Sequence, residues 1–126
     1  MANGKTILLA EDEQAIRRVL VDSIEKIGYS VIEAANGEEG YALAISKKPD
    51  CIILDVIMPK MHGLEVLDKI RADAGDWGKK VPIILLTNFA DDPRVIEANK
   101  LGKCELLSKT NIRLDDVVKR IKDAIA

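Results

Sequence analysis

The chain has 126 residues, of which 48% are apolar and 32% charged, and its formal net charge is −2. These values are typical of one globular domain, so we expect a single domain over residues 1–126. The charge balance gives little support for direct nucleic-acid binding, and the apolar runs are too short to span a bilayer. The N-terminus lacks the pattern of a signal peptide. We therefore expect a cytoplasmic protein without direct nucleic-acid or membrane contacts.

Five short apolar runs predict β-strands, because continuous apolar stretches of this length suit strands covered on both faces of a sheet. The predicted strands span residues 6–10, 30–33, 51–54, 81–86 and 104–107. Cys51 and Cys104 lie in two of these runs, and no CxxC or Cys/His cluster is present. We interpret them as buried, reduced thiols.

Five amphipathic segments with helical spacing follow the strands. The first ends at Gly28, and the second begins with the capping box of Asn36 and Glu39. The fourth begins with Asp92 as its N-cap, followed by Pro93, and it ends at Gly102. The apolar residues of the third and fifth segments are Leu64, Leu67, Ile70, Leu114, Val117, Val118, Ile121 and Ile125.

The alternation of strands and helices predicts an α/β fold, with helices on both faces of a five-stranded parallel sheet. Residues 73–80, DAGDWGKK, interrupt this pattern. We expect them to form an extended loop in which Trp77 is a partly packed anchor.

Polar side chains occur where the predicted strands end, and the ligands of open α/β sheets bind at that edge. Glu11 and Asp12 follow the first strand, Asp55 the third and Thr87 the fourth, while Lys109 stands just past the fifth. Taken singly, these residues have ordinary explanations as helix-terminal charges, turn residues, caps or solvated surface groups. Their joint position at one edge indicates a site.

The chemistry of this set indicates phosphoryl transfer. Three gathered carboxylates repel one another unless a cation offsets them. Mg²⁺ prefers such oxygen ligands and keeps waters that leave room for a phosphate oxygen. An ammonium and a hydroxyl supply donors for the remaining phosphate oxygens, and a carboxylate can act as the nucleophile.

Five stretches carry a resemblance that covers essentially the whole chain: ILLAEDE (7–13), AANGEEG (34–40), IILDVIMPKMHGLEVL (52–67), PIILLTN (82–88) and LLSKTN (106–111). They resemble the receiver domains of two-component response regulators, of the chemotaxis-regulator type. The resemblance implies a flavodoxin-like, doubly wound (βα)5 fold with strand order 2-1-3-4-5. It also implies a single receiver domain over residues 1–126, without an output domain, that is a monomer or a weak dimer.

The resemblance further implies that Asp55 accepts a phosphoryl group from a sensor histidine kinase or a histidine phosphotransfer protein, and that an unknown downstream protein receives the signal. Such a domain catalyses its own phosphorylation and slow autodephosphorylation and is not a turnover enzyme. Asp12 and Asp55 would bind Mg²⁺ directly, with Mn²⁺ as a substitute. Glu11 would assist through water, and the backbone carbonyl of Ile57 would complete the protein ligands.

By the same resemblance, Lys109 pairs with the acceptor carboxylate and then with the phosphoryl group. Thr87 turns inward to hydrogen-bond a phosphoryl oxygen, which starts the conformational switch, and Asn88 borders the phosphate where a smaller residue is usual. Leu106 is a second switch candidate, but it stands where many members have Tyr or Phe, so it is alternatively a core residue. The output surface is expected on the fourth helix, fifth strand and fifth helix.

Four further positions qualify the resemblance. Thr110 replaces the usual proline, and because a cis bond without proline costs about 2.5–4 kcal/mol, we expect a trans bond or an altered loop there. His62, the single histidine, replaces an acid and is expected to be exposed in a loop. Ile57 and Phe89 flank the mouth of the site, where apolar groups cannot orient a water molecule. We therefore expect slow autodephosphorylation.

Three alternatives remain open. A degenerate receiver would keep the fold and bind proteins independently of phosphorylation. A hydrolase of the aspartyl-phosphate class would need an acid two residues after the nucleophile, where this chain has Ile57. A flavodoxin-like cofactor carrier would need a phosphate-binding turn after the first strand, where the acidic run of residues 10–14 would repel phosphate.

Overall fold

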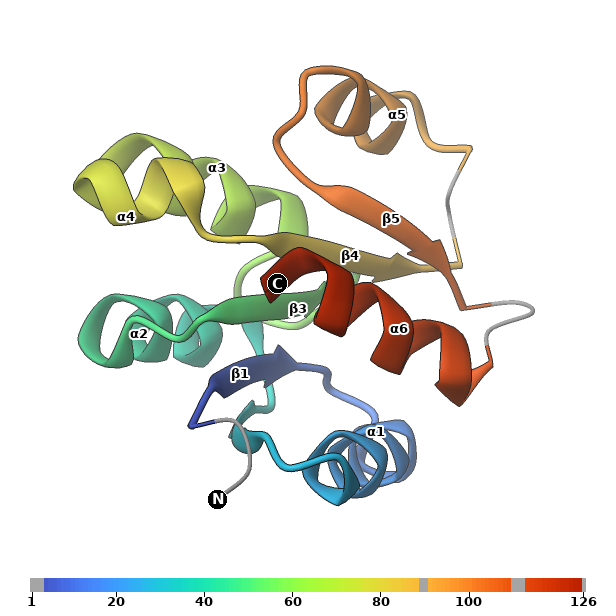
Figure 1. Ribbon diagram of the computed structural model, residues 1–126. Coiled ribbons are helices and arrows are strands. Elements are labelled where there is room, and N and C mark those ends of the chain that lie inside the picture. The colour runs from blue at the N-terminus through green and yellow to red at the C-terminus, as the bar shows by residue number, and fades with distance from the viewer. Residues whose placement is uncertain (1–3, 89–90, 110–112, 126) are drawn as a thin grey trace.

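Strands and helices alternate along the chain in the computed structural model, which describes residues 4–88, 91–109 and 113–125 (Figure 1). The strands are β1 (Thr6–Ala10), β2 (Ser30–Ala34), β3 (Cys51–Asp55), β4 (Ile83–Thr87) and β5 (Glu105–Ser108). The helices are α1 (Gln14–Lys26), α2 (Gly37–Lys47), α3 (Gly63–Asp73), α4 (Gly75–Lys80), α5 (Pro93–Lys100) and α6 (Leu114–Ile125). None of the helices in this described part of the chain combines the length and the apolarity needed to cross a membrane.

The strands form one parallel sheet in the order β2-β1-β3-β4-β5, which confirms the predicted flavodoxin-like topology. From β1 the chain first runs outward to β2 and then returns past β1 to β3. The connections that leave β1 and β3 therefore diverge, and the carboxyl ends of these two neighbouring strands lie beside an open crevice. This is the position at which doubly wound sheets bind ligands.

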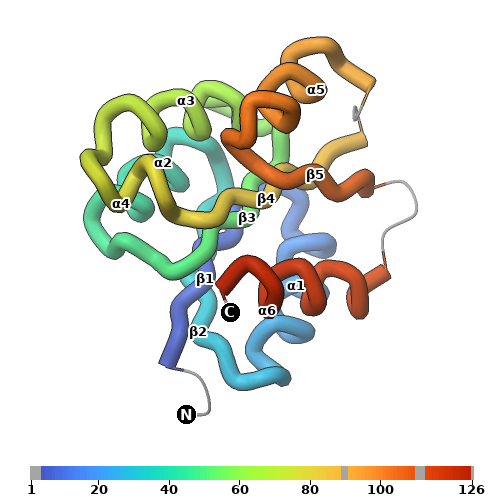
Figure 2. Tube along the Cα trace, turned by 45° about the horizontal axis from the view of Figure 1, so that its top comes forward, coloured from blue at the N-terminus to red at the C-terminus, as the bar shows by residue number. Residues whose placement is uncertain are grey.

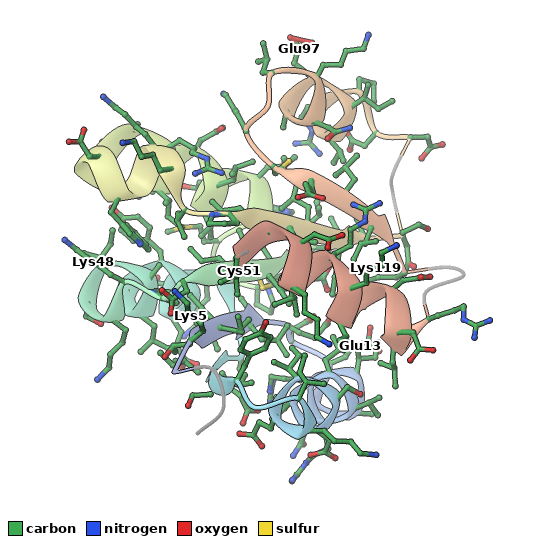
Figure 3. The ribbon with its side chains drawn as sticks, viewed as in Figure 1. Lys5, Glu13, Lys48, Cys51, Glu97 and Lys119 are labelled. Atoms are coloured by element: carbon green, nitrogen blue, oxygen red, sulfur yellow. The ribbon has the colours of Figure 1, made fainter. Side chains whose placement is uncertain are left out.

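Helices cover both faces of the sheet (Figure 2). Side chains alternate along each strand, so Leu8 and Ala10 of β1 pack in a cluster with α2, α3 and α5, while Ile7 and Leu9 pack in a second cluster with α1 and α6. Cys51, labelled in Figure 3, belongs to the second cluster. Both cysteines are buried and free, as predicted.

Local signals set where several helices begin. The side chain of Asn36 accepts a hydrogen bond from the Glu39 N–H at 2.8 Å, and the Glu39 carboxylate accepts one from the Ala35 N–H at 3.0 Å. The predicted capping box is therefore confirmed, although the glutamate bonds to the residue before the N-cap. Asp92 caps α5 by accepting the Arg94 N–H at 2.8 Å, and Pro93 is the first residue of that helix.

The prediction of an extended loop at residues 73–80 is wrong, because α3 continues to Asp73 and α4 follows at once. Gly75 adopts a left-handed φ of +66°, which turns the chain between the two helices. Trp77 packs against the core, as expected, and donates its indole N–H to the Pro49 carbonyl at 3.2 Å. Arg71 donates to the carbonyls of Gly78 at 2.9 Å and Val81 at 2.7 Å. These tertiary contacts outweigh the low helix propensity of the segment.

All strands except β1 end one residue farther toward the carboxyl edge of the sheet than predicted. Asp55 is the last residue of β3 and pairs with Leu86, and Thr87 is the last residue of β4 and pairs with Ser108. The strands β4 and β5 also begin later than predicted, at Ile83 and Glu105. The backbones of Asp55 and Thr87 are thus held by the sheet itself, which places both side chains at a rigid edge.

Candidate functional site

The three predicted acids meet where β1 and β3 end. Carboxylate oxygens of Glu11, Asp12 and Asp55 all lie within 4.8 Å of one another. Glu11 is fully buried and Asp55 is 5% exposed, whereas Asp12 is exposed at the surface. Glu11 follows β1 directly, and its N–H donates to the Ala34 carbonyl of β2 at 3.1 Å. The sheet therefore holds two acids at the base of the site and a third at its opening.

Lys109 contacts the two buried acids of this cluster. Its Nζ lies 3.0 Å from Asp55 Oδ2 and 2.9 Å from Glu11 Oε1. Its backbone N–H donates to the Thr87 carbonyl at 2.8 Å, which fixes the chain just past β5. The Lys109 side chain is 9% exposed, so its ion pairs are shielded from water and weakly screened by salt.

Burial and crowding perturb the titration of two groups. Burial is the main reason that the pKa of Glu11 rises to about 7; the contact with Lys109 opposes this rise, and the Asp55 carboxylate adds to it. Burial alone would lower the pKa of Lys109, but its bonds to Glu11 and Asp55 outweigh that effect and raise the pKa. The lysine therefore stays charged near neutral pH, while Glu11 readily takes up a proton. A divalent cation could replace that proton.

The arrangement fits a hard divalent cation such as Mg²⁺. Every ligand atom that the cluster offers is a carboxylate oxygen, the type Mg²⁺ prefers. Oε1 of the buried Glu11 lies 2.9 Å from the Lys109 ammonium. One ammonium cannot offset three ionised carboxylates, and a cation with its bound waters would balance the remaining negative charge.

A small open pocket of about 210 Å³ lies over the acids, and it is lined by Asp12, Glu13, Asp55, Ile57, Asn88 and Lys109. Ile57 is 45% exposed at its mouth, and its N–H donates to Asp55 Oδ1 at 3.3 Å. Asn88 is also exposed. The pocket brings the Asp55 carboxylate, the Lys109 ammonium and the exposed acid Asp12 together in one open space.

The remaining predicted residues lie around this pocket or away from it. Thr87 is buried at the end of β4. Leu106 is half-buried, pairs with Leu85 in the sheet and packs against the edge of the cluster under α2, α3 and α5. His62 is exposed before α3, as predicted. Phe89 and Thr110, including the bond that precedes Thr110, lie outside the described residues.

Two residues that the sequence did not single out border the site. Glu13, labelled in Figure 3 where the chain enters α1, donates its N–H to Glu11 Oε2 at 3.2 Å and lies 3.8 Å from Lys109 Nζ. Arg17 donates from Nη1 to the Glu11 carbonyl at 2.7 Å and from Nε to the Glu33 carboxylate at 3.1 Å. The run of three acids was a signal for Glu13, whereas no pattern distinguished Arg17 from its neighbour Arg18.

Solved structures with the same fold include several receiver domains. The chemotaxis protein CheY4 of Vibrio cholerae is 28% identical, with a TM-score of 0.84 over 96% of this chain and 98% of that chain. The receiver domain of the sensor histidine kinase PA1611 of Pseudomonas aeruginosa is 27% identical, with a TM-score of 0.85 over 97% of this chain and 98% of that chain. That structure has a magnesium ion coordinated in its active-site cleft.

Curated relatives include transcriptional regulatory proteins of bacteria. The phosphate regulon transcriptional regulatory protein PhoB of Pseudomonas aeruginosa is 32% identical over 84% of this chain and 45% of that protein. The transcriptional regulatory protein SrrA of Staphylococcus aureus is 34% identical over 92% of this chain and 46% of that protein. The chain thus spans about half the length of these relatives. Residues 7–122 match the family described as the response regulator receiver domain. The chain therefore belongs to the response regulator receiver domains of two-component systems.

Proposed function

We propose that Asp55 accepts a phosphoryl group from the phosphohistidine of a sensor kinase or a phosphotransfer protein. The observation that carries the proposal is the 3.0 Å contact between Lys109 Nζ and Asp55 Oδ2 inside a cluster of acids. In the transfer, an oxygen of Asp55 attacks phosphorus, and the P–N bond of the phosphohistidine breaks as the new P–O bond forms. Lys109 offsets the charge of the carboxylate and then of the bound phosphoryl group.

We propose that Asp12, Asp55 and the Ile57 carbonyl hold Mg²⁺, or Mn²⁺ in its place, while Glu11 contributes through water. The oxygen-only cluster supports this assignment, as does the magnesium site of the related receiver domain. When bound, the ion would neutralise charge on the carboxylates and on the transferring phosphoryl group. Without it, the like charges of the acids and an incoming phosphate would repel one another.

Thr87 and Asn88 are proposed to contact the phosphoryl oxygens, because Thr87 ends β4, and Asn88 follows it, at the edge where Asp55 ends β3. Movement of Thr87 would begin the signal, and the surface of α5, β5 and α6 would pass it to a downstream protein. Leu106 is half-buried against the core, so we propose that any relay through it acts by repacking of an aliphatic side chain. The cytoplasmic location expected from the sequence stays a prediction.

The domain is proposed to release its phosphoryl group slowly. Ile57 lies at the mouth of the pocket, where its side chain cannot donate or accept a hydrogen bond to orient an attacking water. It also stands where an aspartyl-phosphate hydrolase would need an acid, so turnover catalysis has no support. The acids and the lysine occur together, and this argues against the degenerate receiver that the sequence left open.

Phosphorylation by a small phosphodonor tests the proposal. The purified domain is incubated with phosphoramidate, with and without Mg²⁺, and the intact mass is measured. We expect a gain of one phosphoryl group that requires Mg²⁺ and is lost in Asp55→Asn. Asp68→Asn is the matched control, because Asp68 is exposed on α3 and pairs only with Lys103 among the described residues. Labelling of Asp55→Asn at the unmodified level, or no labelling of the unmodified domain, would contradict the assignment.

A further inference from the structure

The segment between β3 and α3, residues 56–62, is held in place at both of its ends. At the site end, the Val56 N–H donates to the Leu86 carbonyl at 3.2 Å, and the Gly63 N–H donates to the Val56 carbonyl at 2.8 Å. Met58 is buried against the core. The segment that carries Ile57 is therefore a backbone turn that is closed by hydrogen bonds.

The far end of this turn rests against the beginning of α2. The Gly37 N–H donates to the Pro59 carbonyl at 3.3 Å, and the Met61 N–H donates to the same carbonyl at 2.8 Å. Lys60, which lies between Pro59 and Met61, adopts a left-handed φ of +70°. This backbone is unfavourable for a residue other than glycine, so it depends on the contacts around it. The hydrogen bond from Gly37 of α2 to Pro59 is one of the contacts that support this conformation of Lys60.

Gly37 permits this contact because it has no side chain. A Cβ at Gly37 would lie 1.7 Å from the Met61 carbonyl oxygen and 2.6 Å from its carbon. Both atoms belong to the backbone, so no change of rotamer could relieve the overlap. Since Cβ atoms essentially never approach closer than 3.0 Å, either the turn or the start of α2 would have to move by more than 1 Å. Gly37 is needed here for close approach.

We propose that Gly37 is a positioning residue for the metal site: the start of α2 supports the 56–62 turn and so sets the place of the Ile57 carbonyl beside Asp12 and Asp55. This inference rests on the proposed function, in which that carbonyl binds Mg²⁺. Gly37 touches neither the metal nor the acids and acts through the turn. Residues that orient metal ligands in this indirect way typically change metal affinity about 10–100-fold when they are altered.

Gly37→Ala tests the proposal, with Gly40→Ala as the matched control. Gly40 lies one turn along the same helix and is also buried, but a Cβ there would meet only side-chain carbons, Ala10 Cβ at 3.2 Å and Ala34 Cβ at 3.8 Å. Mg²⁺ affinity is measured by calorimetry, and stability is measured by urea unfolding without Mg²⁺. We expect Gly37→Ala to weaken Mg²⁺ binding about tenfold or more, while Gly40→Ala binds as the unmodified domain does, whatever its stability.

Amide chemical shifts in the unmodified domain provide a second test that does not depend on the folding of a variant. On addition of Mg²⁺, the Gly37 amide should shift together with those of the 56–62 turn, whereas the Gly40 amide should not. Equal affinity in Gly37→Ala, the same loss in Gly40→Ala, or a Gly37 amide that ignores Mg²⁺ would overturn the role of Gly37. If the unmodified domain fails to bind Mg²⁺ at all, the proposed metal site itself is wrong, and this inference falls with it.

Discussion

The buried carboxyl of Glu11 predicts an unusual dependence of stability on pH. Its pKa is about 7 in the folded chain, against an ordinary value of 4.5. As the pH rises between these values, the unfolded chain releases a proton that the folded chain still holds. The free energy of unfolding therefore falls with rising pH across this interval. At about 1.4 kcal/mol for each pH unit of the difference, the loss is about 3 kcal/mol.

Glu11→Gln removes the titrating group while keeping its size. In metal-free buffer, the variant should become more stable relative to the unmodified domain as the pH rises, and the difference should grow by about 3 kcal/mol from below 4.5 to above 7. Urea unfolding followed by the fluorescence of Trp77 measures both proteins at each pH. Subtracting one curve from the other cancels the contributions of the remaining titrating groups.

The control for this comparison is Glu25→Gln, because Glu25 is exposed on α1. The same pH-dependent difference in this variant would show that the effect does not come from the burial of Glu11. A difference between Glu11→Gln and the unmodified domain that stays constant with pH would refute the reasoning, since it would mean that Glu11 ionises as freely in the folded chain as in the unfolded one. Saturating Mg²⁺ should abolish the loss, because the ion binds the ionised acids of the folded state.

Two further predictions concern the mouth of the pocket and the support of the sheet. Ile57→Asn should speed the loss of the phosphoryl group on the order of tenfold, because the amide can orient an attacking water. The rate is measured as the decay of the phosphorylated mass. A phosphoryl lifetime of seconds in the unmodified domain that Ile57→Asn leaves unchanged would contradict this. Arg71→Ala should lower the free energy of unfolding by about 3 kcal/mol, because it leaves the carbonyls of Gly78, Val81 and Lys103 without their charged donor. Arg71→Lys should recover only part of that loss, since an ammonium cannot replace the planar fork, and full recovery in urea unfolding would argue against the explanation.

The sheet and the acids of the site could be predicted because both depend on local patterns. Short apolar runs define strands, and in a parallel sheet the ends of neighbouring strands meet at one edge. Asp55 and Lys109 are far apart in sequence, yet their positions after two such runs were enough to expect them to lie together. The order of the strands came instead from the resemblance to receiver domains.

Other features depend on tertiary contacts that no local pattern records. The segment containing Gly75 and Trp77 has the composition of a loop, but it folds as α4 because Trp77 reaches Pro49 and Arg71 reaches the end of the helix. The importance of Gly37 comes from a backbone carbonyl that belongs to another segment of the chain. Both cases involve main-chain groups as partners, and side-chain patterns carry no information about them.

The two apolar clusters on opposite faces of the sheet have a consequence for mutational tolerance. They consist of different side chains, since neighbouring residues of each central strand point to opposite faces. Substitutions under α1 and α6 should therefore combine additively with substitutions under α2, α3 and α5. The sequence of one layer of helices can then diversify while the opposite layer and the strand ends remain unaltered. The surface that this layer offers to other proteins would change with it.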